Sequence, residues 1–329
     1  PSDFEILAST DACKIAAFEN NAKKLYGIQF HAEVAHTLSG NKILKNFVFN
    51  ICKSTKDWEI KNLSKKLIKE IKKEVGNNSV IMGVSGGVDS TVAATLINKA
   101  IGSKLYFVFI DHGLIRNGEA QEIKDFFDKK LRFKRFYFVD ASKIFLERLK
   151  GITEPEEKRK IIGHTFIEVF ENKVIDLEKK YPTIKFLGQG TIYPDRIESA
   201  QPTKYASKIK SHHNITLPEK MKLRVIEPLR EFYKDEVRKL GKELKIPDEI
   251  LKRHPFPGPG LAIRILGEVT EERLRILREA DYIFIEELKK SGFYDKTWQA
   301  FAALLPVKAV GVMGDARTYE YIISLRAVT

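Results

Sequence analysis

The chain has 329 residues, with 57 lysines and arginines against 44 aspartates and glutamates, for a formal net charge of +13. This length predicts two domains and a sizeable buried core. Apolar runs fall short of the roughly 18 residues of a membrane span, and the start has neither a basic region nor an apolar signal core. We therefore expect a cytoplasmic globular protein with no membrane association.

Residues 1–54 are expected to form the first domain. In it, "KLYGIQFHAEV" is an apolar-rich strand that leads into the pair His31 and Glu33, and "NKILKNFVFNICK" has the apolar spacing of a helix. Cys13 and Cys52 lack a CxxC motif and a histidine at ligand spacing. The sequence therefore predicts neither a disulfide framework nor a zinc site.

A lysine-rich segment at 61–75, "KNLSKKLIKEIKKEV", opens the second region. Its apolar residues recur at helical spacing and its lysines occupy the opposite face, which is typical of a solvated helix. The net charge is also compatible with nucleic acid or phosphorylated small molecules. No zinc-finger, basic-zipper or RNA-recognition pattern occurs, so we expect no nucleic-acid partner and keep a nucleic-acid-binding protein as the alternative.

The region 55–252 alternates strand-like and helix-like patterns. The β-rich runs lie at 80–84, 105–110, 136–139, 184–187 and 223–226, with helix-like stretches that include 119–131 and 154–180. This order predicts an α/β fold built on a doubly wound, mainly parallel sheet. Ligands of such sheets bind at the carboxyl ends of the strands.

The stretch "IMGVSGGVDSTVAATL" (81–96) combines a strand, a glycine loop and a helix. Backbone N–H groups and the helix dipole at such a junction bind phosphate, and Ser85, Gly86 and Gly87 fit that role. The GxxxxGK[ST] motif is absent, and an acid such as Asp89 lies beside phosphates mainly when a divalent cation bridges them. The loop predicts Mg²⁺-pyrophosphate as the bound species, and the alternative is a plain strand-to-helix turn.

The amino-acid composition changes at residue 253, where "RHPFPGPGLAIRILGEV" is dense in proline and glycine. Such density predicts a domain boundary or a rigid functional loop. An amphipathic helix at about 271–290 and strand-like runs at 308–313 and 319–328 follow. We therefore expect a small α+β domain over 253–329.

The loop "SGGVDS" resembles the signature of the N-type ATP pyrophosphatases, which cleave ATP between the α- and β-phosphates and adenylate a substrate oxygen. Within that group, "RHPFPGPGLAIRILGE" resembles the start of the dimerisation domain of the GMP synthetases. "LYGIQFHAEV" resembles the end of a class I glutamine amidotransferase domain. With "TIYPDRIES", "IKSHHN", "VGVMGDAR" and "SLRAV", the resemblance to the glutamine-hydrolysing GMP synthetases extends over the whole chain.

The resemblance implies roles for single residues. Lys210 would stabilise charge on the α-phosphate during adenylation, and Asp89 would hold Mg²⁺. The segment 156–166, "EEKRKIIGHTF", resembles a mobile lid with phosphate-facing cations, and its alternative is a solvated helix. The loop residues that would bind ATP and pyrophosphate are Val84, Ser85, Gly86, Gly87, Val88, Asp89 and Ser90. The residues that would contact xanthosine monophosphate (XMP) are Arg116, Gln299, Asp315 and Arg317.

The glutaminase part of the resemblance is incomplete. His31 and Glu33 would be the catalytic base and its orienting carboxylate, but neither cysteine has the glycine-flanked setting of the family's nucleophile. We expect the chain to begin inside the amidotransferase domain and to be unable to hydrolyse glutamine by itself. Ala32 replaces the usual proline between the pair, and Ile215 with Thr216 replaces the usual glycines of the "HHN" loop.

The implied activity belongs to purine biosynthesis. ATP would adenylate O2 of XMP with release of pyrophosphate, and ammonia derived from glutamine would then displace AMP to give GMP. Activation is needed because a carbonyl oxygen is a poor leaving group. The implied cofactor is Mg²⁺ and the implied assembly is a homodimer. The alternative within this chemistry is another amidating or tRNA-modifying pyrophosphatase, which "HPFPGPG" argues against.

Overall fold

The computed structural model describes residues 2–34, 36–56, 62–199, 223–313 and 316–329. The chain divides into two compact units, Pro1–Glu59 and Ile60–Thr329. The boundaries proposed from the sequence at 54/55 and 252/253 remain predictions. No helix in the described ranges is both long and apolar enough to cross a membrane.

The first unit contains a three-stranded antiparallel sheet. Its strands are β1 (Glu5–Ala8), β2 (Ala17–Asn20) and β3 (Leu25–Ile28), in the order β1-β2-β3, followed by α1 (Gly40–Lys45) and the π-helical turn η1 (Asn46–Ile51). Its buried apolar side chains are alanines, whereas larger ones such as Ile6, Leu7 and Phe47 are exposed. The strand and helix expected around His31 are confirmed.

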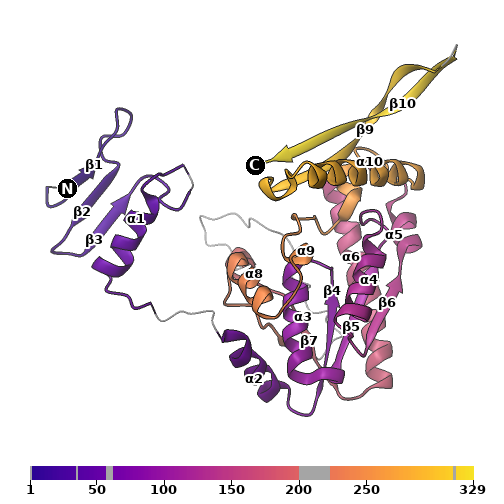
Figure 1. The fold of residues 1–329 in the computed structure, drawn as a ribbon, viewed down its shortest axis with the longest axis horizontal. Coiled ribbons are helices and arrows are strands. Elements are labelled where there is room, and N and C mark those ends of the chain that lie inside the picture. The colour runs from indigo at the N-terminus through magenta and orange to yellow at the C-terminus, as the bar shows by residue number, and fades with distance from the viewer. Residues whose placement is uncertain (1, 35, 57–61, 200–222, 314–315) are drawn as a thin grey trace. The chain divides into compact units, whose positions relative to one another are not determined.

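The second unit is built on a five-stranded parallel sheet (Figure 1). The strands are β4 (Ser79–Val84), β5 (Leu105–Asp111), β6 (Phe136–Asp140), β7 (Ile184–Gly188) and β8 (Arg224–Ile226). They lie in the order β6-β5-β4-β7-β8, and all four neighbouring pairs are parallel. The predicted doubly wound α/β fold and its five strands are confirmed.

Helices cover both faces of this sheet, which explains why its central strands β4 and β5 are almost continuously apolar and buried. In β4, Val80 and Met82 belong to one buried cluster and Ile81 to the other. The first cluster includes side chains of α2 (Leu63–Val75), α3 (Val88–Ile101) and α8 (Lys234–Glu243), and the second those of α5 (Ser142–Leu149) and α6 (Pro155–Lys180). Burial on both faces produces a continuous apolar run instead of an alternating one.

Short helices connect these elements. The expected helix at 119–131 is divided into α4 (Glu119–Asp125) and the π-helical η3 (Phe126–Lys130). The other short helices are η2 (Gly102–Lys104), α7 (Tyr193–Ser199), α9 (Asp248–Leu251), η4 (Gly260–Arg264) and η5 (Tyr294–Lys296).

A long hairpin and one helix complete the second unit. Helix α10 (Glu271–Lys290) precedes β9 (Gln299–Met313) and β10 (Ala316–Val328), which pair antiparallel from Met313 and Ala316 back to Gln299 and Val328. At the base, the Trp298 N–H donates to the Val328 carbonyl (2.7 Å), and the Trp298 side chain is 64% exposed. Both strands expected from the sequence are present and are longer than predicted.

One prediction about α6 is wrong. The segment 156–166, expected as a lid with cations over phosphates, lies within this continuous helix, and Lys158 is buried. Its ammonium donates to the carbonyls of Ala262 (3.2 Å), Ile265 (2.7 Å) and Gly267. Arg159 and Lys160 are exposed, as in the solvated-helix alternative. Lys158 therefore anchors α6 to the chain after η4.

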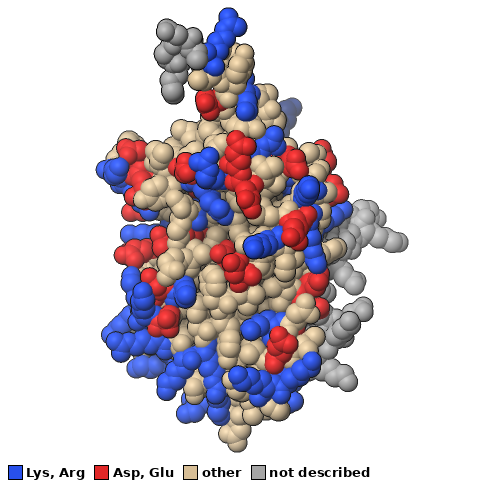
Figure 2. Space-filling view, turned by 90° about the vertical axis from the view of Figure 1, so that its right-hand side faces the viewer, with Lys and Arg blue, Asp and Glu red and all other residues tan. Residues whose placement is uncertain are grey.

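Lysine and arginine side chains gather at the lower end of the face in Figure 2, the end of the unit at which α6 terminates. Lys179 and Lys180 lie in the last turn of α6. Basic residues at a helix carboxyl terminus interact favourably with the helix dipole. Part of the positive charge therefore has a local structural role.

Candidate nucleotide-binding site

The predicted phosphate loop lies where the strand order of the sheet reverses. The chain leaves β4 for β5 on one side, whereas β7 and β8 lie on the other side of β4. The loops after β4 and β7 therefore border the crevice at which doubly wound sheets bind ligands. Ser85, Gly86 and Gly87 follow β4, and Gly190 follows β7.

Two glycines permit the close approaches in this crevice. Gly86 has φ +74°, and a Cβ there would lie 2.4 Å from Cδ1 of Ile123. Gly190 has no room for a Cβ either, since that atom would lie 3.0 Å from N and Cα of Ser90. A side chain at either position would push the loop out of place. The role of Gly190 was not evident from the sequence because a single glycine after a strand has many explanations.

The start of α3 presents backbone N–H groups beside this loop. Gly87 is the N-cap with an extended backbone, and its N–H donates to Ser85 Oγ (3.3 Å). Its carbonyl accepts from Ser90 Oγ (3.1 Å) and Thr91 Oγ1 (2.8 Å). The helix thus starts directly after an exposed Ser85 and a half-buried Gly87, an arrangement suited to an anion.

Asp89 has one paired and one unpaired oxygen. Its Oδ2 accepts from Nζ of Lys234 at 2.5 Å, while its Oδ1 is buried and accepts no hydrogen bond from the described residues. A carboxylate oxygen without a partner fits a ligand of Mg²⁺. Within the described part of the chain no cluster of three or more histidine, cysteine or acidic residues could hold a metal. The remaining ligands of Mg²⁺ would then be phosphate oxygens and water.

Lys234 brings a cation to the loop from a distant segment. It is the first residue of α8, and it lies 145 positions after Asp89. The loop sequence contains no lysine, and the folded chain instead brings the positive charge of Lys234 to the loop. No spacing pattern in the sequence indicated this contact.

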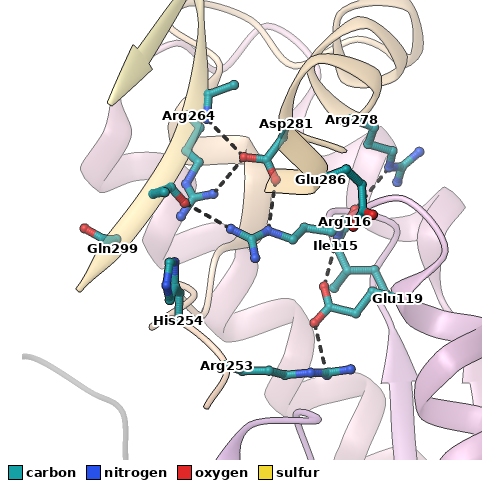
Figure 3. A network of polar contacts seen from close by, with 12 residues as sticks. Ile115, Arg116, Glu119, Arg253, His254, Arg264, Arg278, Asp281, Glu286 and Gln299 are labelled. Atoms are coloured by element: carbon teal, nitrogen blue, oxygen red, sulfur yellow. Dashed lines mark hydrogen bonds and ion pairs between the residues drawn. The ribbon is translucent and has the colours of Figure 1, made fainter. Parts of the chain in front are cut away.

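A second cluster of polar side chains surrounds Arg116, in the loop after β5 (Figure 3). The Arg116 Nε lies 2.9 Å from Oδ2 of Asp281, a residue of α10 that is 1% exposed. Its Nη2 donates to the Ala300 carbonyl (3.3 Å), next to Gln299, whose Nε2 donates to the Pro255 carbonyl (3.4 Å). The structure thus places Arg116 against the residue that follows Gln299, and the binding of XMP by both residues stays a prediction.

Further contacts hold the β5 loop in place. Arg278 Nε donates to the Ile115 carbonyl (3.1 Å), and Arg278 Nη2 donates to the Gly113 carbonyl. The Gly113 N–H in turn donates to Oδ1 of Asp111 (2.8 Å), whose pKa is raised by burial. His112 is buried, which lowers its pKa to about 4, and its Nδ1 accepts from the Leu114 N–H (3.1 Å). These bonds fix the position of Arg116.

Arg253 joins the proline-rich segment to the phosphate loop. Its Nη1 lies 3.6 Å from Oε1 of Glu119, and its Nη2 donates to Oε2 of Glu122 (3.2 Å). Its Nη1 also donates to the Gly86 carbonyl (3.4 Å). The next residue, His254, stacks on Tyr294 with ring centroids 3.8 Å apart, and burial lowers its pKa. The rigid loop expected from "HPFPGPG" therefore contacts both clusters.

The remaining predicted residues are spread out. Arg317 pairs with Val312 near the tip of the hairpin, roughly 40 Å along the strand from Gln299. The structure therefore does not bring Arg317 to Arg116 within one chain. Lys210 and Asp315 lie outside the described residues.

In the first unit, His31 Nδ1 and Glu33 Oε1 are 2.7 Å apart, as expected of a histidine and its orienting carboxylate. Both side chains are exposed. Hydrogen bonds from the Glu33 backbone amide and from His31 lower the pKa of Glu33.

Three family models match successive segments of the chain. "Glutamine amidotransferase class-I" matches residues 1–51, "NAD synthase" matches 59–158 and "GMP synthase C terminal domain" matches 286–329. The "GMP synthase [glutamine-hydrolyzing]" of Carboxydothermus hydrogenoformans is 56% identical over 330 residues, covering 100% of this chain and 64% of that protein. The protein of the same name from Aquifex aeolicus is 57% identical over 331 residues, covering 100% and 63%.

Over its full length the chain is therefore similar to the curated GMP synthases. It spans about 64% of the length of the curated GMP synthases it matches. Among solved structures, an NMN synthetase from Francisella tularensis aligns with a TM-score of 0.45 at 16% identity, over 73% of this chain and 94% of that one. The amidotransferase match contains His31 and Glu33, and the NAD synthase match contains the phosphate loop and Arg116.

Proposed function

We propose that this chain carries the synthetase chemistry of a GMP synthase, in which ATP adenylates O2 of XMP and ammonia then displaces AMP. The observation that carries the proposal is the glycine loop at the strand-order reversal, with the unpaired Asp89 oxygen beside it. ATP, XMP and glutamine-derived ammonia are the proposed substrates. We further propose a cytoplasmic homodimer that does not bind nucleic acid.

The loop from Val84 to Ser90 would hold the pyrophosphate part of ATP. The N–H groups at the start of α3 would donate to phosphate oxygens, and Asp89 would hold Mg²⁺, which neutralises phosphate charge when bound. The Lys234 ammonium would keep a positive charge close to Asp89. Lys210 stays a prediction for the stabilisation of charge on the α-phosphate.

Arg116 and Gln299 would bind XMP at the second polar cluster. A guanidinium suits the XMP phosphate because it can donate two parallel hydrogen bonds to it. Asp315 and Arg317 stay predicted contacts. His31 and Glu33 would serve a glutaminase cysteine, and the synthetase reaction itself would use ammonia.

The hairpin supports the homodimer proposal. Val307, Val310, Tyr319 and Leu325 are at least half exposed on β9 and β10. Clusters of exposed apolar side chains commonly mark association surfaces.

The test is to incubate the chain with XMP, ATP, Mg²⁺ and ammonium, and to measure AMP, pyrophosphate and GMP. We expect all three products together, and their loss in Asp89→Ala. Asp128→Ala, an exposed acid at the start of η3, is the matched control and should leave the products unchanged. Product formation unaffected by Asp89→Ala would contradict the assigned role. Duplex binding that falls steeply with salt would favour the nucleic-acid alternative.

A further inference from the structure

We propose that Asp281 is a positioning residue, which fixes the guanidinium of Arg116 in the orientation that receives the anionic group of XMP. The proposal rests on the function proposed above. It concerns a residue of α10 whose side chain is 1% exposed and whose carboxylate lies next to the Arg116 guanidinium (Figure 3). Nothing in the sequence pattern pointed to this aspartate.

Residues from three separate segments contact the Asp281 carboxylate. Its Oδ1 accepts from the Ala302 N–H of β9 (3.0 Å) and lies 3.5 Å from Nη1 of Arg264 in η4. Its Oδ2 lies 2.9 Å from Nε of Arg116. One carboxylate therefore aligns two guanidinium groups and one strand.

The contacts of Arg116 leave one edge of its guanidinium open. Its Nε faces Asp281, its Nη2 donates to the Ala300 carbonyl, and its plane lies over the Phe256 ring at 5.0 Å. In the described part of the chain, Nη1 has no hydrogen-bond acceptor, and the side chain is 19% exposed. Among the described residues, Nη1 is therefore the guanidinium nitrogen of Arg116 without a contact, whereas Nε lies against Asp281 and Nη2 donates to Ala300.

The charges of the cluster favour an anion at that edge. Arg116 and Arg264 share the single carboxylate of Asp281, so these three side chains together carry one positive charge in excess. The neighbouring Glu119, which accepts from the Arg116 backbone N–H (3.2 Å), is paired with Arg253. Arg264 is 5% exposed, and burial followed by the charge of Arg116 lowers its pKa to about 10. A phosphate would compensate the excess charge, and a guanidinium is suited to bind it.

The test compares Asp281→Asn with Glu279→Gln in the same protein. Asn keeps the shape and can still accept from Ala302, but it removes the charge that holds both arginines. Glu279 lies two positions earlier on α10, is exposed and pairs with Arg275, so it controls for the loss of one acid from the helix. The readouts are XMP affinity by calorimetry without ATP, KM for XMP and for ATP, and the thermal midpoint.

We expect Asp281→Asn to weaken XMP binding at least tenfold while KM for ATP changes less than twofold, and Glu279→Gln to change neither. Unchanged XMP affinity would overturn the proposal. A parallel loss of XMP binding, ATP use and thermal stability would also overturn it, because it would indicate a structural role only.

A second variant keeps the test decisive if Asp281→Asn does not fold. Arg116→Lys retains the charge but cannot contact Asp281 and Ala300 together, so it should show the same loss confined to XMP. XMP affinity equal to that of the wild type would contradict the proposal. If the wild-type chain itself fails to bind XMP, the function proposed above fails first, and the two failures are thereby distinguished.

Discussion

Lys234 and Asp89 form an ion pair at the loop that is proposed to bind pyrophosphate. The pair is partly exposed, so solvent weakens its contribution to stability. Its location gives it another role, because the ammonium is in direct contact with the Asp89 carboxylate beside the loop. We infer that Lys234 limits repulsion between Asp89 and incoming phosphates.

Lys234→Met is therefore expected to lower kcat/KM for ATP about tenfold, or roughly 1.4 kcal/mol of transition-state stabilisation. Lys239→Met, an exposed lysine on the same helix that pairs with Asp235, is the control. Pyrophosphate release at several ATP concentrations measures the effect. Equal values in both variants would show that the contact with Asp89 has no role in ATP use.

His112 makes stability depend on pH. Burial lowers its folded-state pKa from 6.5 to about 4, so below pH 6.5 the unfolded chain binds the proton more readily. The contribution of neutral His112 to the free energy of unfolding is therefore fully present above pH 6.5 and is lost as the pH falls towards 4. This group alone should reduce the free energy of unfolding by about 2 kcal/mol between pH 7 and pH 5.

Urea denaturation at the two pH values checks this expectation. His112→Gln should lose less stability on acidification than the wild type. His164→Gln, which replaces an exposed histidine of α6, should behave like the wild type. Identical pH dependence in all three proteins would contradict the assignment to His112.

At the residue scale, the sequence predicted the groups that lie close together in the chain. Ser85, Gly86 and Asp89 form a contiguous loop with a recognisable composition. Lys234 and Asp281 approach from distant helices and carry no local pattern, so only the folded structure identifies them.

At the scale of elements, the loop between β4 and α3 depends on the left-handed backbone of Gly86. Gly86→Ala adds a Cβ in contact with Ile123 and forces a strained φ. We expect it to cost about 2 to 4 kcal/mol of unfolding free energy, from the strained backbone together with overpacking. The same change should reduce ATP use, because the loop would shift.

Gly163→Ala is the matched comparison. Gly163 lies inside α6 with open space where a Cβ would be placed, so alanine should stabilise the helix by about 0.5 to 1 kcal/mol. Chemical denaturation of both variants measures the difference between their free energies of unfolding directly. A Gly86→Ala protein as stable as the wild type would show that the loop tolerates another conformation.

Helices and strands were predicted correctly where a sequence pattern is compatible with only one kind of element. The five strands were identifiable because parallel strands with two covered faces are uniformly apolar. The lid assignment failed because a lysine in a charged helical stretch gives no sign that it will be buried. Lys158 is retained in the interior by three carbonyl acceptors that come from residues about a hundred positions later.

At the scale of the whole molecule, the two units have separate cores. The two buried clusters of the second unit draw on residues from Leu63 onwards, with none from 1–59. A chain lacking residues 1–59 is therefore expected to fold, with a thermal midpoint within a few degrees of the value for the same unit in the longer chain.

Ammonium-dependent GMP formation by the shortened chain provides the second measurement and should match that of the longer chain. Loss of cooperative unfolding after removal of 1–59 would show that the first unit contributes to the fold of the second. Loss of activity with intact folding would instead assign the first unit a role in synthesis.

The sequence also indicated a separate carboxyl-terminal region, but the packing is more continuous than its composition suggests. Ala302 and Leu304 of β9 share a buried cluster with Ile81 of β4 and Val108 of β5. Proline and glycine density marks a rigid connection as readily as a boundary, and composition alone does not distinguish the two.

The exposed indole at the base of the hairpin offers a spectroscopic reporter. The chain has two tryptophans, of which Trp58 lies outside the described residues, and a Trp58→Phe protein would have Trp298 as its single tryptophan. Trp298 directly precedes Gln299 and is in contact with water. Its emission should therefore shift when XMP occupies the adjacent site, so that substrate occupancy can be followed optically without any turnover.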